Sequence, residues 1–163
     1  MKIYAILANS RSRAPILPQG TKPMTRKASK FIDWIDDEIM FGDLTKLELP
    51  KFEVCAGSVF DSMQISSKYM AVSQKMSKIV DKYSANLTMI ECIDSDERKW
   101  YLIKPVAWND SREAIKEIPE SDFNNLQFVK NYTATIFFAP ESFVLECKKS
   151  RLTGLQYILL DKI

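Results

Sequence analysis

Four acidic residues surround a tryptophan early in the sequence. They are Asp33, Asp36, Asp37 and Glu38, with Trp34 among them. On a helix, positions three and four apart share a face, so Asp33, Asp36 and Asp37 would lie together. Such a patch could bind a basic partner surface and speed association, or it could be an ordinary solvated helix face. Acid–base catalysis is the weakest interpretation, because no base or nucleophile motif accompanies these carboxylates.

A second tryptophan stands among polar residues, in the run Trp108-Asn109-Asp110. An exposed indole beside polar groups is typical of the residues that dominate the binding energy of protein interfaces. Trp108 also follows an apolar run, so it could equally belong to the core. The candidate partner-binding residues are Asp33, Trp34, Asp36, Asp37, Trp108 and Asp110.

The composition excludes most classes of catalyst. Histidine is absent, so no imidazole can act as a base, an acid or a metal ligand. The four glycines stand too far apart for a GxGxxG or P-loop phosphate cradle. The remaining nucleophiles are Ser58, Ser73, Ser142 and Cys147, and none lies in a GxSxG elbow. We therefore expect no enzyme and no cofactor: the patterns favour Ser73 and Ser142 as helix N-caps and Cys147 as a small buried hydrophobe.

Cysteine spacing and hydropathy indicate where the protein acts. Cys55, Cys92 and Cys147 form no CxxC pair, which argues against a structural zinc site and favours a reducing compartment. The first apolar run is too short for a secretory signal, and no stretch approaches the length of a membrane span. The net charge of +2 lacks the clustered basic face typical of nucleic-acid binders. The sequence predicts a cytoplasmic protein that binds neither membrane nor nucleic acid.

The elements that must position these residues follow from apolar periodicity. A length of 163 residues favours one domain, residues 1–163. We expect strands at residues 2–8, 44–54, 69–72, 87–93, 100–106, 133–138 and 155–160. We expect helices near residues 31–40, 74–83 and 143–150. Ala139 and Pro140 should end the strand before them, and Gly154 should take a left-handed turn conformation. The pattern predicts an α+β single domain with a mostly antiparallel sheet and two or three short helices.

One order of elements occurs twice. Residues 69–92 and 136–160 both show a strand, a serine, a short helix and a strand, with little residue identity between them. This pattern is a weak indication of a duplicated unit.

Four blocks of the sequence, in this order, resemble a known family. They are the opening MKIYAILAN, the block at residues 60–80 with its Val-Ser before a helix, WYLIKPVAWNDSREA at 100–114, and residues 136–160 with RLTGLQY. Together they resemble the immunity proteins numbered family eleven of bacterial polymorphic toxin systems, formerly a domain of unknown function. The stretch after residue 107 departs from that family, which is usually richer in aspartate there.

The resemblance implies an inhibitor without catalytic activity. Such a protein would bind a cognate toxin effector in the cell that produces the toxin and neutralise it by occlusion. The alternative is a small-molecule or nucleic-acid-binding domain of unrelated role.

Overall fold

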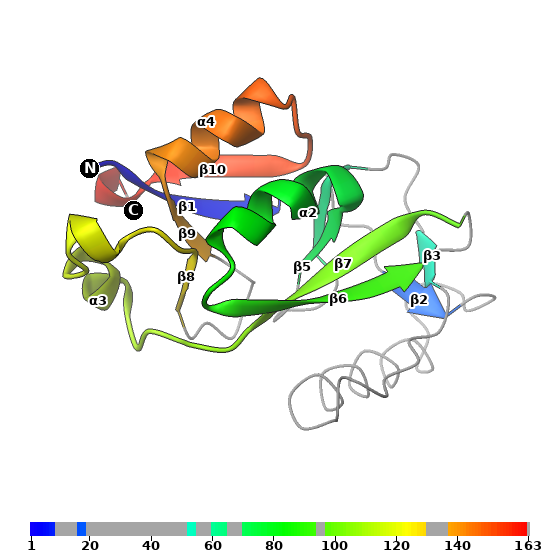
Figure 1. The fold of residues 1–163 in the computed structure, drawn as a ribbon, viewed down its shortest axis with the longest axis horizontal. Helices are drawn as coiled ribbons and strands as arrows, with labels where there is room; N and C mark the ends of the chain where they lie inside the picture. Colours follow the sequence, from blue (N-terminus) through cyan, green and yellow to red (C-terminus); the bar gives the residue numbers. More distant parts are fainter. Residues whose placement is uncertain are drawn as a thin grey trace.

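Two four-stranded antiparallel sheets dominate the residues that the computed structural model describes, which are 1–8, 16–18, 52–54, 60–64, 70–93, 97–129 and 137–162 (Figure 1). The first sheet has the order β10 (Leu155–Leu159), β1 (Ile3–Ala8), β9 (Phe137–Pro140), β8 (Gln127–Phe128). The second has the order β4 (Ser62–Gln64), β5 (Met70–Ser73), β7 (Lys99–Pro105), β6 (Leu87–Ile93). A short pair joins β2 (Ile16–Pro18) to β3 (Phe52–Val54). The predicted α+β class is confirmed.

Short helices connect these strands. The α-helices are α2 (Gln74–Val80), α3 (Arg112–Lys116) and α4 (Glu141–Lys149). The 3-10 helices are η2 (Asp81–Tyr83), η3 (Glu120–Asp122) and η4 (Leu160–Lys162). In the described segments, no helix is long and apolar enough to cross a membrane.

The two sheets are built on the same plan. The first unit along the chain forms the second sheet. In it, β5 leads through α2 to β6, and β7 lies between these two parallel strands and antiparallel to both. The second unit forms the first sheet. In it, β9 leads through α4 to β10, and β1 lies between them in the same way. The outer strands β4 and β8 pair with β5 and β9. The sequence duplication thus corresponds to a shared topology, in which β1, from the start of the chain, takes the position of β7.

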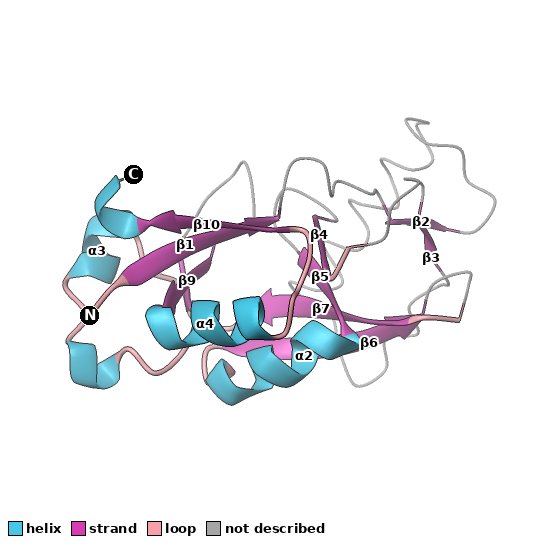
Figure 2. Cartoon of the chain, turned by 90° about the horizontal axis from the view of Figure 1, so that it is seen from above, coloured by secondary structure: helices cyan, strands magenta, loops and turns pink. Residues whose placement is uncertain are grey.

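A single apolar core holds both units together. Helix α2 buries Met76, Ile79 and Val80, and α4 buries Phe143 and Val144, in one cluster that includes strands of both sheets. Figures 1 and 2 show α2 and α4 side by side and antiparallel, on the same side of the two sheets. A smaller cluster, which contains Ile115 of α3, covers the other face of the first sheet.

Several predicted elements are confirmed at their expected positions. Ser73 caps α2, because its hydroxyl oxygen accepts a hydrogen bond from the Met76 N–H at 3.2 Å. Strands β6 and β7 form the predicted hairpin, with Leu87 opposite Pro105. The predicted helix at 31–40 and most of the strand at 44–54 lie outside the described residues.

Two predictions near the start of α4 need correction, and one helix was not predicted. Ala139 and Pro140 do not end the strand before them: both belong to β9, opposite Tyr4 and Ile3. Proline fits there because it is the last residue of the strand, where its φ of −70° also leads into a helix. Helix α4 therefore begins at Glu141, and Ser142 lies inside it and does not cap it. Helix α3 was not predicted, because its short charged sequence buries only Ile115.

The Asp61 carboxylate joins the two units. One oxygen accepts a hydrogen bond from the Ser73 hydroxyl at 2.7 Å, at the start of α2. The other accepts from the backbone N–H and the hydroxyl of Thr153, at 2.9 and 3.1 Å, in the turn after α4. The Asp61 N–H in turn donates to the Thr153 hydroxyl oxygen at 3.2 Å. This aspartate therefore fixes the start of one unit's helix against the end of the other's.

Gly154 lies beside this junction in a left-handed conformation, with φ of +79°. A Cβ atom at this position would lie 2.6 Å from Phe60 Cβ and 2.7 Å from the Ser62 carbonyl oxygen. The predicted left-handed turn is confirmed, and the close approach excludes any side chain for a second reason.

We predict that Gly154→Ala lowers the free energy of unfolding by about 2–4 kcal/mol, from backbone strain and overpacking together. Urea unfolding measures the loss. The matched control is Arg151→Ala, since Arg151 has a φ of +51° and already carries a Cβ. That control should change stability by no more than about 0.5 kcal/mol. Equal losses in the two variants would show that the Gly154 contact is not close.

We also predict that Asp61 and Ser73 are energetically coupled. A double-mutant cycle of Asp61→Ala with Ser73→Ala should give a coupling of about 1–2 kcal/mol, because each variant removes the other's hydrogen-bond partner. The control cycle combines Asp61→Ala with Ser111→Ala. Ser111 caps α3 by accepting a hydrogen bond from the Ala114 N–H at 3.2 Å. Asp61→Ala and Ser111→Ala should be additive. Additivity in both cycles would contradict the joining role of Asp61.

Candidate partner-binding surface

The loop after β7, residues 106–111, exposes two large apolar side chains. Val106 is 58% exposed and Trp108 is 37% exposed. The only other large hydrophobic residues exposed in the described part of the chain are Met1 and Leu145. We call this segment the Trp108 loop.

Asn109 anchors the Trp108 loop to the edge of the first sheet. Its backbone N–H donates to the Phe128 carbonyl oxygen at 2.7 Å, next to a parallel bridge with Val129. Its side-chain amide donates to the same oxygen at 3.1 Å and to Gln127 Oε1 at 3.3 Å. Ser111 then caps α3. The loop is thus held at its centre and at its end.

The Trp108 ring packs against the core. It contacts Phe128 edge-on, with ring centroids 6.1 Å apart. From there an aromatic row continues through Phe137 and Phe143 to Tyr83, with centroid separations of 6.1, 5.9 and 5.3 Å. Trp108 is therefore partly covered by the core and 37% exposed, and its role in partner binding stays a prediction.

The structure places two of the six candidate partner-binding residues. Trp108 and Asp110 lie together on the Trp108 loop, and Asp110 is exposed. Asp33, Trp34, Asp36 and Asp37 lie outside the described residues, so their role stays a prediction. Sequence reasoning missed Val106 and Asn109. The signal for Val106 was its position directly after a strand, where an apolar side chain loses the cover of the sheet.

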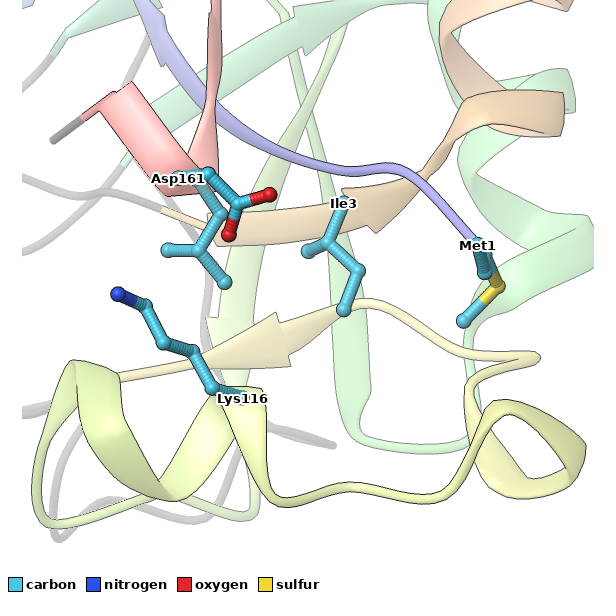
Figure 3. A pocket seen from close by; sticks show the side chains of 5 residues that line it. Met1, Ile3, Lys116 and Asp161 are labelled. Carbon is cyan, nitrogen blue, oxygen red and sulfur yellow. The ribbon is translucent and has the colours of Figure 1, made fainter.

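A cavity of about 160 Å³ lies between the chain start, α3 and η4 (Figure 3). Its lining is formed by Met1, Ile3, Lys116, Leu160 and Asp161. The N-terminal ammonium group forms an ion pair with Glu120 nearby. Among the described residues, no group of three or more histidine, cysteine, aspartate and glutamate side chains could hold a metal ion. The cavity offers one cation and one carboxylate, which is too little to define a ligand.

Cys147 is fully buried in the shared core, as the sequence predicted. Burial raises the pKa of its thiol to about 12. Burial also raises the pKa of the Tyr157 hydroxyl, which lies close to this thiol. The thiol therefore stays protonated near neutral pH, which is the opposite of what a nucleophile needs.

No family model matches the chain, and no curated protein or solved structure shows significant similarity to it. The resemblance to the immunity family therefore rests on the four sequence blocks. The fold gives one of their motifs a structural role: Thr153 and Gly154 of RLTGLQY make the contacts to Asp61 and Phe60. Their presence is explained by packing, independently of any partner.

The buried thiol predicts a pH dependence at the alkaline end. The unfolded thiol loses its proton near pH 9, whereas the folded one keeps it to about pH 12. The folded state binds more protons in this window, so the free energy of unfolding should fall as the pH rises, by up to about 1.4 kcal/mol per pH unit from this group. Urea unfolding at a series of pH values measures the slope. Cys147→Ala should reduce the slope between pH 9 and pH 10, below the range in which Tyr157, whose pKa is also raised by burial, adds a slope of its own. An unchanged slope there would contradict the assignment to Cys147.

Proposed function

We propose that this protein is an immunity protein that binds a cognate bacterial toxin and neutralises it by occlusion, without chemistry of its own. The observation that carries the proposal is Trp108, a large aromatic side chain held partly exposed on an anchored loop beside an exposed carboxylate. The family resemblance of the four blocks supports the same function. The proposal places the protein in the cytoplasm of the producing cell, where self-intoxication must be prevented.

The Trp108 loop has the physical properties of a binding anchor. Tryptophan is enriched among residues whose truncation costs an interface most. A side chain that is already fixed loses little conformational entropy when a partner covers it, so more of the contact energy appears as affinity. Packing on Phe128 and the hydrogen bonds of Asn109 provide this fixation.

The chemistry of the loop indicates the kind of toxin surface. Val106 and Trp108 offer apolar area, and Asp110 adds negative charge beside it. A partner patch that combines an apolar pocket with a basic rim is complementary to this arrangement. Toxins that act on nucleic acid or nucleotides tend to be basic around their sites, which fits such a partner. We expect an interface of ordinary size, about 800 Å² per partner.

The test uses the protein encoded by the neighbouring gene as the candidate toxin. Co-expression should restore growth of cells that make the toxin, and calorimetry should detect a one-to-one complex. Trp108→Ala should weaken binding by about 2 kcal/mol, or roughly thirtyfold. The control is Gln156→Ala, an exposed position on β10 at the edge of the first sheet opposite β8, which should leave affinity unchanged.

Charge reversal of Asp33, Asp36 and Asp37 tests the other predicted contact. It should slow association and reduce its salt dependence if the acidic cluster faces the toxin. Failure of the wild-type protein to bind or protect would overturn the proposed function. It would favour the alternative of a small-molecule or nucleic-acid-binding domain.

A further inference from the structure

A hollow opens on the surface where η2, directly after α2, meets α4 and the residue that follows it. It has a volume of about 550 Å³ and is lined by Lys82, Glu146, Lys149 and Ser150. Lys82 and Glu146 form an ion pair of 2.6 Å across the two helices. Tyr83 Oη lies 3.3 Å from both Ser142 Oγ and Glu146 Oε1 and closes one end. We call this hollow the helix groove.

A row of exposed lysine side chains runs along α2 and ends at the helix groove. Lys75, Lys78 and Lys82 are spaced by three and four residues, so they form one exposed row on the helix surface. Lys82 lines the groove, and Lys75 and Lys78 precede it on the exposed surface of α2. Lys149 faces this row from α4.

The acids of the two helices do not balance these cations. The exposed cations of α2, η2, α4 and the following turn are Lys75, Lys78, Lys82, Lys148, Lys149 and Arg151. The acids of the same segments are Asp81, Glu141 and Glu146. Glu146 is already paired with Lys82, and Glu141 with Lys2. These segments therefore carry more cations than acids, although the whole chain has a net charge of only +2. One of the cations, Lys148, lies over the Tyr157 ring of β10.

An exposed leucine lies within this basic surface. Leu145 is 59% exposed and lies one turn before Lys148 and Lys149 on α4. An isolated apolar side chain gains nothing from a phosphate backbone, but it can enter an apolar pocket of a protein. Single-stranded nucleic acid would need exposed aromatic rings on which its bases stack. The aromatic residue at the groove, Tyr83, is instead packed edge-on against Phe143.

We propose that the helix groove docks an acidic segment of a partner protein, with Leu145 as its apolar anchor. The lysines on the two sides would neutralise carboxylates of that segment, and an apolar residue of the segment would cover Leu145. This surface differs from the Trp108 loop in place and in charge preference. The inference holds whether or not the partner is a toxin.

The test uses three fluorescent probes and anisotropy measurements. The first is a short peptide that alternates glutamate with leucine, the second has serine in place of leucine, and the third is a single-stranded oligonucleotide of equal charge. The leucine peptide should bind the wild-type protein most tightly. Lys78→Glu combined with Lys149→Glu should weaken its binding about tenfold and lower its salt dependence. Leu145→Ser should reduce the affinity for the leucine peptide to that for the serine peptide.

Two further variants control for charge and folding. Lys116→Glu, on α3 at the other face of the first sheet, makes the same charge change as Lys78→Glu alone and should leave peptide binding unchanged, whereas Lys78→Glu alone should weaken it. Lys82 is kept in all variants so that its ion pair with Glu146 survives. If the double charge reversal unfolds the protein, the neutral pair Lys78→Gln and Lys149→Gln replaces it, with a smaller loss expected.

The remaining outcomes decide against the proposal. Equal or tighter binding of the oligonucleotide, with no effect of Leu145→Ser, would make the groove a nucleic-acid surface. No peptide binding, or equal losses in the groove variants and in Lys116→Glu, would show that the groove docks nothing acidic. Trp108→Ala is expected to leave peptide binding unchanged, so failure here and failure of the proposed function remain distinguishable.

Discussion

The shared Asp61 carboxylate is the contact on which the arrangement of the two units depends. Its two oxygens bind the first residue before α2 and the turn after α4, which are 80 residues apart in the chain (Ser73 and Thr153). Gly154 packs its backbone onto Phe60 at the same point because no side chain intervenes. The close-packed core already limits how α2 and α4 can shift against each other, but its apolar contacts are not directional. The directional hydrogen bonds of Asp61 fix one register, and with it the ion pair of Lys82 with Glu146.

Topology adds a second constraint, through β1. The second unit is complete only when the start of the chain lies between β9 and β10, so this sheet needs contacts between the two ends of the sequence. The first unit draws β4 to β7 from residues 62–105 alone. Closing a long loop costs more entropy than closing a short one, so the first unit has the lower barrier to formation. The shared core then gives the second unit a surface on which to assemble, because α4 packs against α2.

Local signals in the sequence predicted local structure well. The Ser73 cap, the β6–β7 hairpin and the left-handed Gly154 each depend on a few neighbouring residues. The pattern failed where distant residues decide: nothing near Asp61 indicates Thr153, and the partial burial of Trp108 depends on Phe128. The basic groove was also hidden, because its lysines come from two segments that only the fold brings together. The net charge of the whole chain averages over such a local surface, so the value of +2 argued against a basic face.

The two candidate surfaces are connected by the aromatic row. Trp108 stands at one end, and Tyr83, beside the helix groove, stands at the other; the three phenylalanines between them are fully buried. Close-packed rings have little freedom to rearrange, so the distance between the Trp108 loop and the groove is set by the core. The loop favours a basic partner patch and the groove an acidic one. A partner that contacted both would need opposite charges at a fixed separation, and a partner with one charge sign would meet repulsion at one of the two sites. Discrimination between related partners would then come from the spacing of the two surfaces as much as from the affinity of either.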